Sequence, residues 1–323
     1  MKTGNKKGFF ARLASLSGFA PFITLAALLA VCCAASPVFR NPGNLLNIAR
    51  QSTCAGLVAL GMTVVIAGGG IDLSVGSLLA MAGVLSLQAM DAMQGVSPVA
   101  AFAVMAAVAL AAGLVGGAVN GALVNYGGMP PFIATLGTYS IFRSVAVYRA
   151  DAGLVQSANS VLNGIDRICG GAFPPLVLLA ATLLLFLVLR YRKFGWSICA
   201  IGSNEKAAFY AAIDVRRIRF ASYVLAGLLC GVSSILLASC FQSVTSTTAG
   251  NAYELDAIAA VIIGGTPMSG GRASVFGTLC GILMLGIIAT ALDLWSISAN
   301  LQGTVKGAII ILSVLLQYRK RRA

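Results

Sequence analysis

Long stretches without charge alternate with short charged segments along the chain. The stretches that contain no Asp, Glu, Lys or Arg are 13–39, 51–71, 73–90, 92–142, 168–189, 220–253 and 273–292. A helix needs about 20 apolar residues to cross the roughly 30 Å of hydrocarbon in a bilayer. The apolar/polar alternation of period two that marks a membrane barrel is absent from the sequence. The pattern therefore predicts a bundle of membrane-spanning helices.

We predict ten spans from these stretches. They lie at about 18–36, 53–69, 73–93, 97–126, 130–149, 173–190, 219–240, 254–265, 273–292 and 300–318. The run at 18–36 follows basic residues, as in a secretory signal, but it is about twice as long as a signal core and further spans follow it. We therefore expect it to be retained as the first span. The span at 254–265 is short for a full crossing.

Composition supports the membrane class. Of the 323 residues, 59% are hydrophobic and 10% are charged, and the mean hydropathy is +0.92. Soluble domains contain about 25% charged residues, so a soluble fold of this composition would expose large apolar patches. We predict an all-α membrane protein in contact with lipid. Its parts are an N-terminal segment at 1–17, one transmembrane domain at 18–318 and a basic tail at 319–323.

The formal net charge of +13 is concentrated in three clusters. Their basic residues are Lys2, Lys6, Lys7 and Arg12 near the N-terminus, Arg190, Arg192, Lys193, Lys206, Arg216, Arg217 and Arg219 in a central loop, and Arg319, Lys320, Arg321 and Arg322 near the C-terminus. Lys and Arg accumulate in loops on the cytoplasmic side of a membrane. We expect both termini and the central loop to be cytoplasmic, in a bacterial inner membrane. Orientation explains the charge, so no nucleic-acid partner is predicted.

The chain has few residues suited to catalysis. It contains no histidine, only nine acidic residues, and no Gly-x-x-x-x-Gly-Lys-Ser/Thr loop for nucleotide phosphates. Its eight cysteines show no metal-ligand spacing. We therefore predict a transport protein that has no ATPase site of its own and uses no metal or cofactor.

A self-sufficient ion-coupled carrier or facilitator is the alternative. Ion coupling uses ionisable groups inside the bundle, which are costly in lipid and therefore rare. The candidates are Asp72, Asp256, Asp293, Lys306 and Arg143. We expect Asp72 to cap a helix N-terminus, and Glu254 and Asp256 to do the same. No proton relay is recognisable among these residues.

Glycines recur at a spacing of four residues in several predicted spans. These sets are Gly113, Gly117 and Gly121; Gly227 and Gly231; Gly277 and Gly281; and Gly303 and Gly307. Small residues on one helix face let the backbones of membrane helices approach closely. We predict close helix packing at all four sets.

Two segments far apart in the chain resemble one another. Gly69-Gly70-Ile71-Asp72-Leu73-Ser74-Val75-Gly76 and Gly264-Gly265-Thr266-Pro267-Met268-Ser269-Gly270-Gly271 both follow an aliphatic run. Glycine pairs, Pro and polar residues at such a point unwind a helix. Paired broken helices in the two halves of a transporter indicate the translocation path. Plain cytoplasmic turns explain the two segments equally well.

The central loop at 191–218 contains a predicted short helix. Asn204 is suited to the N-cap position, Glu205 to the first turn, and an Ala-rich run continues to about Ala212. A mere connector between spans would not need this order. We therefore expect the helix to dock onto another protein.

Four ordered motifs give the chain a family resemblance. They are the loop motif (Phe194-Gly195, AIGSNEKAA at 200–208, and Ile213-Asp214-Val215), GGIDLSVGS at 69–77, MPPFIATLGT at 129–138, and ELDAIAAVIIGGT at 254–266 with Ser269-Gly270-Gly271 and Gly277-Thr278. Together they closely resemble the permeases of ribose/xylose/galactose-type ABC importers, over roughly 40–318. Ser203 stands where this family commonly has Gly, and Phe209-Tyr210 is more aromatic than usual there.

The resemblance implies a fold, a function and partners. The fold would be a ten-helix permease of the cobalamin-importer type, and the function would be ATP-dependent import of a monosaccharide or a related small polyol-like solute. The partners would be an ATPase with two nucleotide sites, a periplasmic sugar-binding protein, and a second copy of the permease or a sister permease. The coupling helix to the ATPase would include Asn204, Glu205, Lys206, Ala207, Ala208 and Tyr210.

Six residues are candidates for contact with the solute along the path. They are Asp72 and Ser74 at the first helix break, Asn120 on the Gly-rich helix, Phe132 and Thr135 after the Pro pair, and Ser269 at the second break. Each is polar or aromatic and therefore suited to a hydroxylated solute. A helix–helix hydrogen bond is an equally good explanation for Asn120 and Thr135. The sequence does not identify the sugar.

Overall fold

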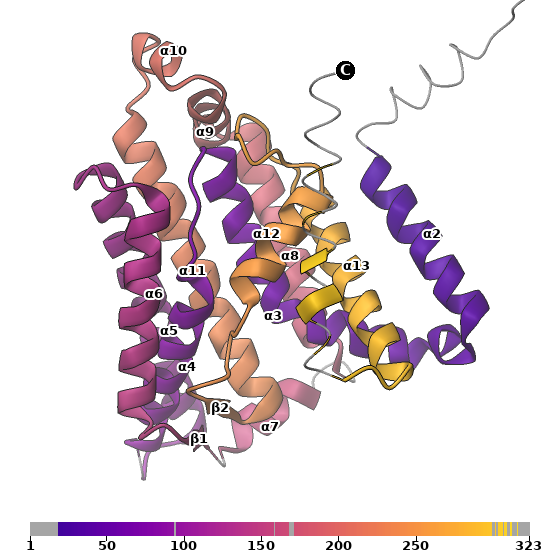
Figure 1. Ribbon diagram of the computed structural model, residues 1–323. Helices are drawn as coiled ribbons and strands as arrows, with labels where there is room; N and C mark the ends of the chain where they lie inside the picture. Colours follow the sequence, from indigo (N-terminus) through magenta and orange to yellow (C-terminus); the bar gives the residue numbers. More distant parts are fainter. Residues whose placement is uncertain are drawn as a thin grey trace, which may run out of the picture.

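The computed structural model describes residues 19–93, 95–157, 159–167 and 171–298, together with residues 301, 303–305, 307, 308, 311 and 315. Most of it is helical, which confirms the predicted class (Figure 1). The helices are α2 (Ala20–Ala35), the 3-10 helix η1 (Pro37–Arg40), α3 (Pro42–Ala67), α4 (Val75–Asp91), α5 (Pro98–Asn125), α6 (Pro131–Arg149), α7 (Ser160–Arg167), α8 (Phe173–Tyr191), α9 (Lys193–Ser203), α10 (Glu205–Tyr210), α11 (Val215–Phe241), α12 (Tyr253–Ile263) and α13 (Val275–Leu294). Two short strands are β1 (Leu154–Gln156) and β2 (Ser243–Thr245).

Five of the described helices are long and apolar enough to cross a bilayer, namely α3, α5, α8, α11 and α13. The apolar helices α2 and α4 are shorter. α3 begins at Pro42 and not near residue 53 as predicted. Asn41 caps it by accepting the Gly43 N–H, and Pro occupies its first turn, which are both signals for a helix start. The predicted span at 300–318 lies mostly outside the described residues.

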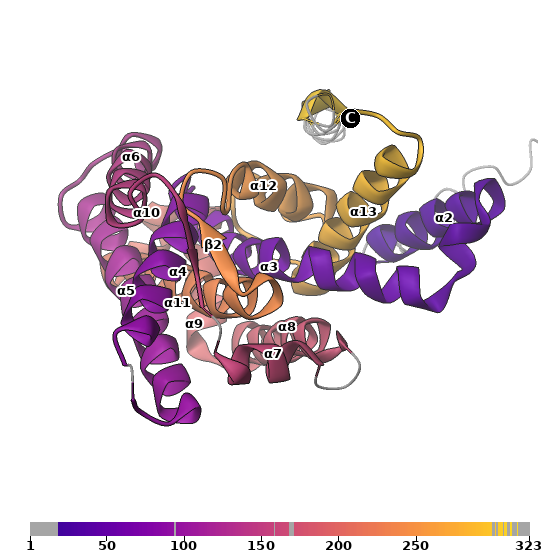
Figure 2. The same ribbon diagram turned by 90° about the horizontal axis from the view of Figure 1, so that it is seen from below.

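The bundle has two distinct ends (Figure 1). We call the end that carries α9 and α10 the loop end, and the end that carries β1, β2 and α7 the sheet end. At the sheet end, β1 and β2 pair antiparallel, with Leu154 opposite Thr245 and Gln156 opposite Ser243. The sequence did not predict this pairing, because a three-residue strand is too short to show a periodicity. α2 lies at one side of the bundle, next to α13 (Figure 2).

α3 is the most enclosed of the long helices. In its most apolar window 83% of the residues are buried, against 28% in α5 and 22% in α8. α3 therefore forms the centre of the bundle. α5 and α8 turn most of their apolar side chains outward, where lipid or another subunit can cover them.

Glycines bring α5 and α11 into backbone contact. A Cβ at Gly113 would collide with the carbonyl oxygen of Gly227, and a Cβ at Gly231 would lie 2.7 Å from the carbonyl oxygen of Ala109. A Cβ at Gly277 or Gly281 of α13 would likewise meet the carbonyl oxygen of Gly264 or Ala260. Close packing is thus confirmed for these sets. No neighbour lies within 4 Å of a Cβ at Gly303 or Gly307, so the prediction of close packing is not supported there in the described part of the chain.

Helices end at both of the resembling segments, as expected for either a helix break or a turn. α3 ends at Ala67 and α12 ends at Ile263. Gly69 (φ +78°) and Gly265 (φ +91°) then adopt left-handed backbone conformations, which are readily available to glycine alone. We call residues 68–74 the first break and residues 264–274 the second break. Each is followed by a helix, α4 and α13 respectively.

α12 accounts for only half of a crossing. Its 11 residues span roughly 16 Å of helix axis. The irregular segment 246–252 completes the crossing from the sheet end. Arg143 of α6 supports this segment, since its Nη1 donates to the carbonyl oxygens of Ser246 (3.0 Å) and Ala249 (2.9 Å). Irregular backbone at membrane depth is tolerated where protein groups satisfy it in this way. The predicted span at 254–265 therefore crosses the bilayer only together with the segment 246–252 that precedes it.

Candidate functional site

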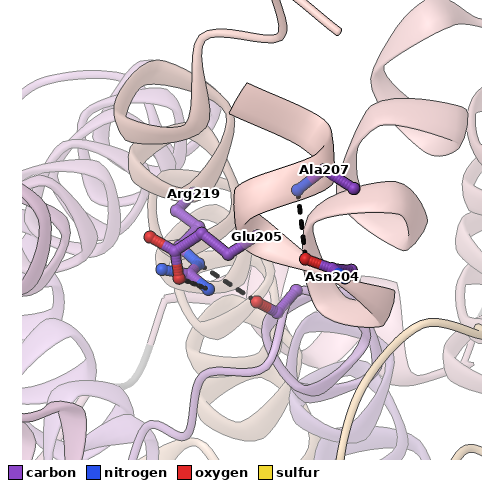
Figure 3. A network of polar contacts seen from close by, with 5 residues as sticks. Asn204, Glu205, Ala207 and Arg219 are labelled. Atoms are coloured by element: carbon purple, nitrogen blue, oxygen red, sulfur yellow. Dashed lines mark hydrogen bonds and ion pairs between the residues drawn. The ribbon is translucent and has the colours of Figure 1, made fainter. Parts of the chain in front are cut away.

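The central loop folds into two helices, α9 and α10, at the loop end. Asn204 is the N-cap of α10, as predicted, and its Oδ1 accepts the Ala207 N–H at 3.0 Å (Figure 3). α10 ends at Tyr210, two residues earlier than expected, and Ala212 has a left-handed φ of +58°. The helix is therefore a single short turn-and-a-half held at its start by a side-chain cap.

α10 presents most of its surface to the exterior. Ala208 is buried, whereas Phe209 is 69% exposed and Tyr210 is 86% exposed. A groove of about 840 Å³ runs beside the helix, lined by Glu205, Lys206, Phe209, Tyr210, Ile213, Asp214, Val215 and Arg216. Large exposed aromatic side chains beside a groove are typical of a protein-binding surface.

Arg219 at the start of α11 connects α10 to the first break (Figure 3). Its Nη2 lies 2.9 Å from Oε2 of Glu205. Its Nε donates to the carbonyl oxygen of Gly68 at 3.1 Å. One guanidinium group thus holds both the first turn of α10 and the end of α3.

The end of α9 touches both breaks. Gly202 packs so closely on the carbonyl oxygen of Ala67 and the N–H of Gly271 that a Cβ would collide with both. The Gly271 N–H donates to the Ala67 carbonyl oxygen at 2.9 Å, which joins the second break to the end of α3. The helices of the central loop therefore rest directly on the two segments that interrupt the bundle.

Three of the predicted path residues form one buried polar cluster. Oδ1 of Asp72 accepts the Ser74 N–H (2.9 Å) and the Ser74 hydroxyl (2.7 Å). Nδ2 of Asn120 donates to Asp72 Oδ2 at 3.1 Å and to Ser74 Oγ at 2.7 Å. Thr138 of α6 completes the cluster by donating to Asn120 Oδ1 at 2.6 Å. All four residues are at most 2% exposed.

The capping role expected for Asp72 is met only in part, because its carboxylate accepts the Ser74 N–H just before α4 but Asp72 is not the N-cap residue. The N-cap of α4 is Ser74, without a side-chain cap bond, and Asp72 instead binds Ser74 and Asn120. Glu254 and Asp256 lie in the first turn of α12, but the N-cap there is Ala252 in a left-handed conformation and no side-chain cap bond forms. Asp and Ser two residues apart favour a local turn over a helix cap, which explains the difference at Asp72.

The other path candidates lie apart from the cluster. Phe132 is 54% exposed. Thr135 is buried and its hydroxyl donates to the Pro131 carbonyl oxygen of its own helix at 2.7 Å. Ser269 lies in the second break and is exposed. A cavity of about 320 Å³ opens beside the Pro130–Pro131 pair. It is lined by Val65, Gly69, Gly70, Val124, Gly128, Met129, Pro130, Pro131, Arg219, Ser222 and Tyr223.

α4 and α12 begin at the same place inside the bundle. A Cβ at Gly76 would collide with the carbonyl oxygen of Gly250, and a Cβ at Gly250 with that of Gly76. From there α4 runs toward the sheet end and α12 toward the loop end (Figure 1). Nη2 of Arg143 and Oε2 of Glu254 are buried without a hydrogen-bond partner in this region. The centre of the bundle therefore holds two helix N-termini and two opposite charges.

Sequence reasoning missed Thr138, Tyr223 and the role of Arg219. Thr138 was quoted only as part of a motif, Tyr223 carried no signal, and Arg219 was counted among residues that set orientation. Tyr223 donates to the Ile71 carbonyl oxygen at 3.1 Å and so supports the first break. A polar residue at helical spacing after the Pro pair was the available signal for Thr138.

Comparison with known proteins agrees with this architecture. The family described as the permease component of branched-chain amino acid transport systems matches residues 44–314. The ribose import permease protein RbsC of Bacillus subtilis is 40% identical over 304 residues, which cover 93% of this chain and 92% of that protein. RbsC of Escherichia coli K12 is 37% identical over 305 residues, 93% of each chain. The D-allose transport system permease protein AlsC of E. coli K12 is 33% identical over 301 residues, 92% of this chain and 90% of that one.

No solved structure gives a significant match. The family match covers most of the chain, and the relatives align along nearly their whole lengths. The helical architecture, the apolar spans and the two helix breaks agree with a membrane permease. The chain belongs to the family of sugar ABC-transporter permeases.

Proposed function

We propose that this chain is the membrane-spanning subunit of an ATP-dependent importer for a monosaccharide. ATP is hydrolysed by a partner subunit that docks on the loop end. The observation that carries the proposal is α10, a capped and exposed helix whose preceding helix rests on both breaks of the bundle. When a docked protein displaces such a helix, the displacement can be transmitted to the transmembrane part.

The docking surface proposed for the ATPase is the exposed side of α10 and its groove. It includes Asn204, Glu205, Lys206, Ala207 and Tyr210, all of which are exposed, with Phe209 between them. Ala208 faces inward and supports the helix from below. Aromatic side chains are favoured as anchors in protein interfaces. The coupling assignment therefore rests on five exposed residues and one buried residue.

The proposed orientation places the loop end in the cytoplasm of a bacterium, with both chain termini on that side. The basic residues Arg190, Arg192, Lys193, Lys206, Arg216, Arg217 and Arg219 all lie at or near the loop end, and Lys and Arg favour the cytoplasmic side of the inner membrane. The sheet end would then face the periplasm and receive the sugar-binding protein. The single transmembrane domain at 18–318 would pair with a second permease copy or a sister permease.

We propose that the solute passes the region between the two breaks. Asp72, Ser74 and Asn120 border the first break, with Phe132 and Thr135 on α6 and Ser269 in the second break. The names of the relatives, which refer to ribose and D-allose, support a monosaccharide. Because Asp72, Ser74 and Asn120 satisfy one another, they shape the path more than they select the sugar, and selection is left to the binding protein.

Reconstitution in proteoliposomes tests this function. The permease would be combined with its ATPase subunit and binding protein, with labelled D-ribose and D-allose as the probes. We expect uptake that requires ATP and both partners, and that persists when ion gradients are collapsed. Uptake without an ATPase that disappears with the ion gradient would instead establish the ion-coupled carrier.

A further inference from the structure

Arg219 is the one described residue that binds the coupling helix and the first break with separate atoms. Its Nη2 pairs with Glu205 Oε2 at 2.9 Å, and its Nε donates to the Gly68 carbonyl oxygen at 3.1 Å. A guanidinium group presents its donors in a rigid planar fork. Movement of either partner therefore turns the whole fork and changes the contact with the other.

The surroundings of Arg219 differ from those of a surface arginine. Its side chain is 23% exposed and that of Glu205 is 56% exposed, so the pair runs from the surface toward the interior. Arg217, two residues earlier on the same helix, pairs with Asp214 only three residues away, and their side chains are 81% and 52% exposed. The Arg217 pair stays within the start of α11, whereas the Arg219 pair links three segments.

The first break continues from Gly68 into the buried cluster. Ile71 is held by the Tyr223 hydroxyl through its carbonyl oxygen at 3.1 Å, and Asp72 is held by Asn120 at 3.1 Å. The segment from Gly68 to Asp72 is short and is held by hydrogen bonds at both ends. A shift of Gly68 would therefore be transmitted along it to the buried cluster. The second break contacts α9 through Gly202 and Ser203, a contact that does not involve Arg219, and its Gly271 N–H also donates to the Ala67 carbonyl oxygen at the end of α3.

We infer that Arg219 is a positioning residue that transmits movement of α10 to the first break. The inference rests on the proposed function, because it assumes that an ATPase moves α10. Displacement of α10 moves Glu205, and Arg219 rotates with its ion-pair partner. The Gly68 carbonyl oxygen at the end of α3, which accepts from Arg219, then moves as well. The second break has its own contact with α9, through Gly202 and Ser203, which does not involve Arg219.

The test measures hydrogen exchange of the backbone amides at 68–74 and 264–274. It uses the full complex of permease and ATPase, without nucleotide and with ATP plus vanadate, so no sugar is required. The variants are Glu205→Gln, which removes the ion pair, and Arg219→Gln, which removes the fork. The double variant Glu205→Arg/Arg219→Glu restores the ion pair with reversed charges but leaves no donor for the Gly68 carbonyl oxygen. Arg217→Gln is the matched control.

We expect nucleotide to change exchange at both breaks in the wild type and in Arg217→Gln. Glu205→Gln, Arg219→Gln and the charge-swapped pair should lose the change at 68–74 and keep the change at 264–274. Gln keeps a polar side chain at both positions, so these variants should fold, and the retained response at 264–274 shows that the ATPase still docks.

Two results would overturn the inference. One is a wild-type response at 264–274 without any response at 68–74. The other is a normal response at 68–74 in Glu205→Gln and Arg219→Gln. Failure of the proposed function looks different, because the wild type would then show no response to nucleotide at either break.

Discussion

The side-chain amide of Asn120 donates to the carboxylate of Asp72 at 3.1 Å, between residues 48 positions apart. The bond ties the first break to α5, and Thr138 extends it to α6. A carboxylate buried in a membrane bundle is costly unless its oxygens are hydrogen-bonded. The arrangement thus explains how an aspartate is held in the centre of this bundle, and it leads to the first prediction.

Replacing Asn120 with Leu should destabilise the protein. The substitution leaves the Asp72 carboxylate without the amide donor, and a buried polar group left unsatisfied costs about 1–3 kcal/mol. Thermal unfolding in detergent measures the effect, with Ser140→Ala on α6 as the control because its hydroxyl is exposed.

Asp72→Ala should likewise lower stability more than it alters sugar preference. A stable Asp72→Ala protein with a new sugar preference would contradict this.

Gly227→Ala should disrupt the contact between α5 and α11. A Cβ at Gly227 would collide with the carbonyl oxygen of Gly113, and overpacking of this kind costs about 1–3 kcal/mol. Gly137→Ala on α6 is the matched control, because a Cβ there meets nothing within 4 Å. The control should be neutral or slightly stabilising, since Ala favours a helix over Gly by about 1 kcal/mol. Equal unfolding temperatures for the two variants would argue against close packing.

Ala207→Glu and Ala208→Glu should fail in different ways. Ala207 is exposed on α10, so a bulky charge there should block ATPase binding while the permease folds normally. Ala208 is 3% exposed, and a buried unpaired charge is strongly unfavourable, so this variant should lose stability. Co-purification of the ATPase and thermal unfolding of the permease alone separate the two effects. Normal ATPase binding by Ala207→Glu would place the docking surface elsewhere.

Arg143→Gln should loosen the segment before α12. The guanidinium of Arg143 donates to the carbonyl oxygens of Ser246 and Ala249, and a hydrogen bond from a charged group contributes about 1.5–3 kcal/mol. Faster hydrogen exchange at 246–252 is the expected result. The control is Arg149→Gln on the same helix, whose side chain binds the half-buried Gln88 at the sheet end. If both variants exchange alike at 246–252, Arg143 does not support the segment.

Local features of this fold were predictable from sequence. The Asn204 cap, the two breaks and most of the glycine contacts depend on the chemistry of a few neighbouring residues. The start of α3 at Pro42 was missed although Asn41-Pro42 is a local signal, because the charge at Arg50 outweighed it. Helix boundaries in a membrane protein therefore follow caps more closely than charge-free stretches.

Long-range pairs in the candidate site were not predictable in the same way. Arg219 and Gly68 are 151 positions apart, and the sequence shows Arg219 only as one of several arginines in a basic loop. Asp72, Ser74 and Asn120 were selected as separate candidates, and nothing in their spacing indicated that they satisfy one another. Which polar groups meet depends on how the helices are packed, which a single sequence does not encode in any local pattern.

The contact between Gly76 and Gly250 has a mechanical consequence. Because neither residue has a side chain, α4 and the segment before α12 meet there backbone to backbone, next to the Glu254 carboxylate of α12. Two surfaces without interlocking side chains can part and rejoin without any change of rotamer, whereas an interdigitated core would have to be repacked. At this contact in the middle of the bundle, α4 and α12 can therefore separate as rigid pieces.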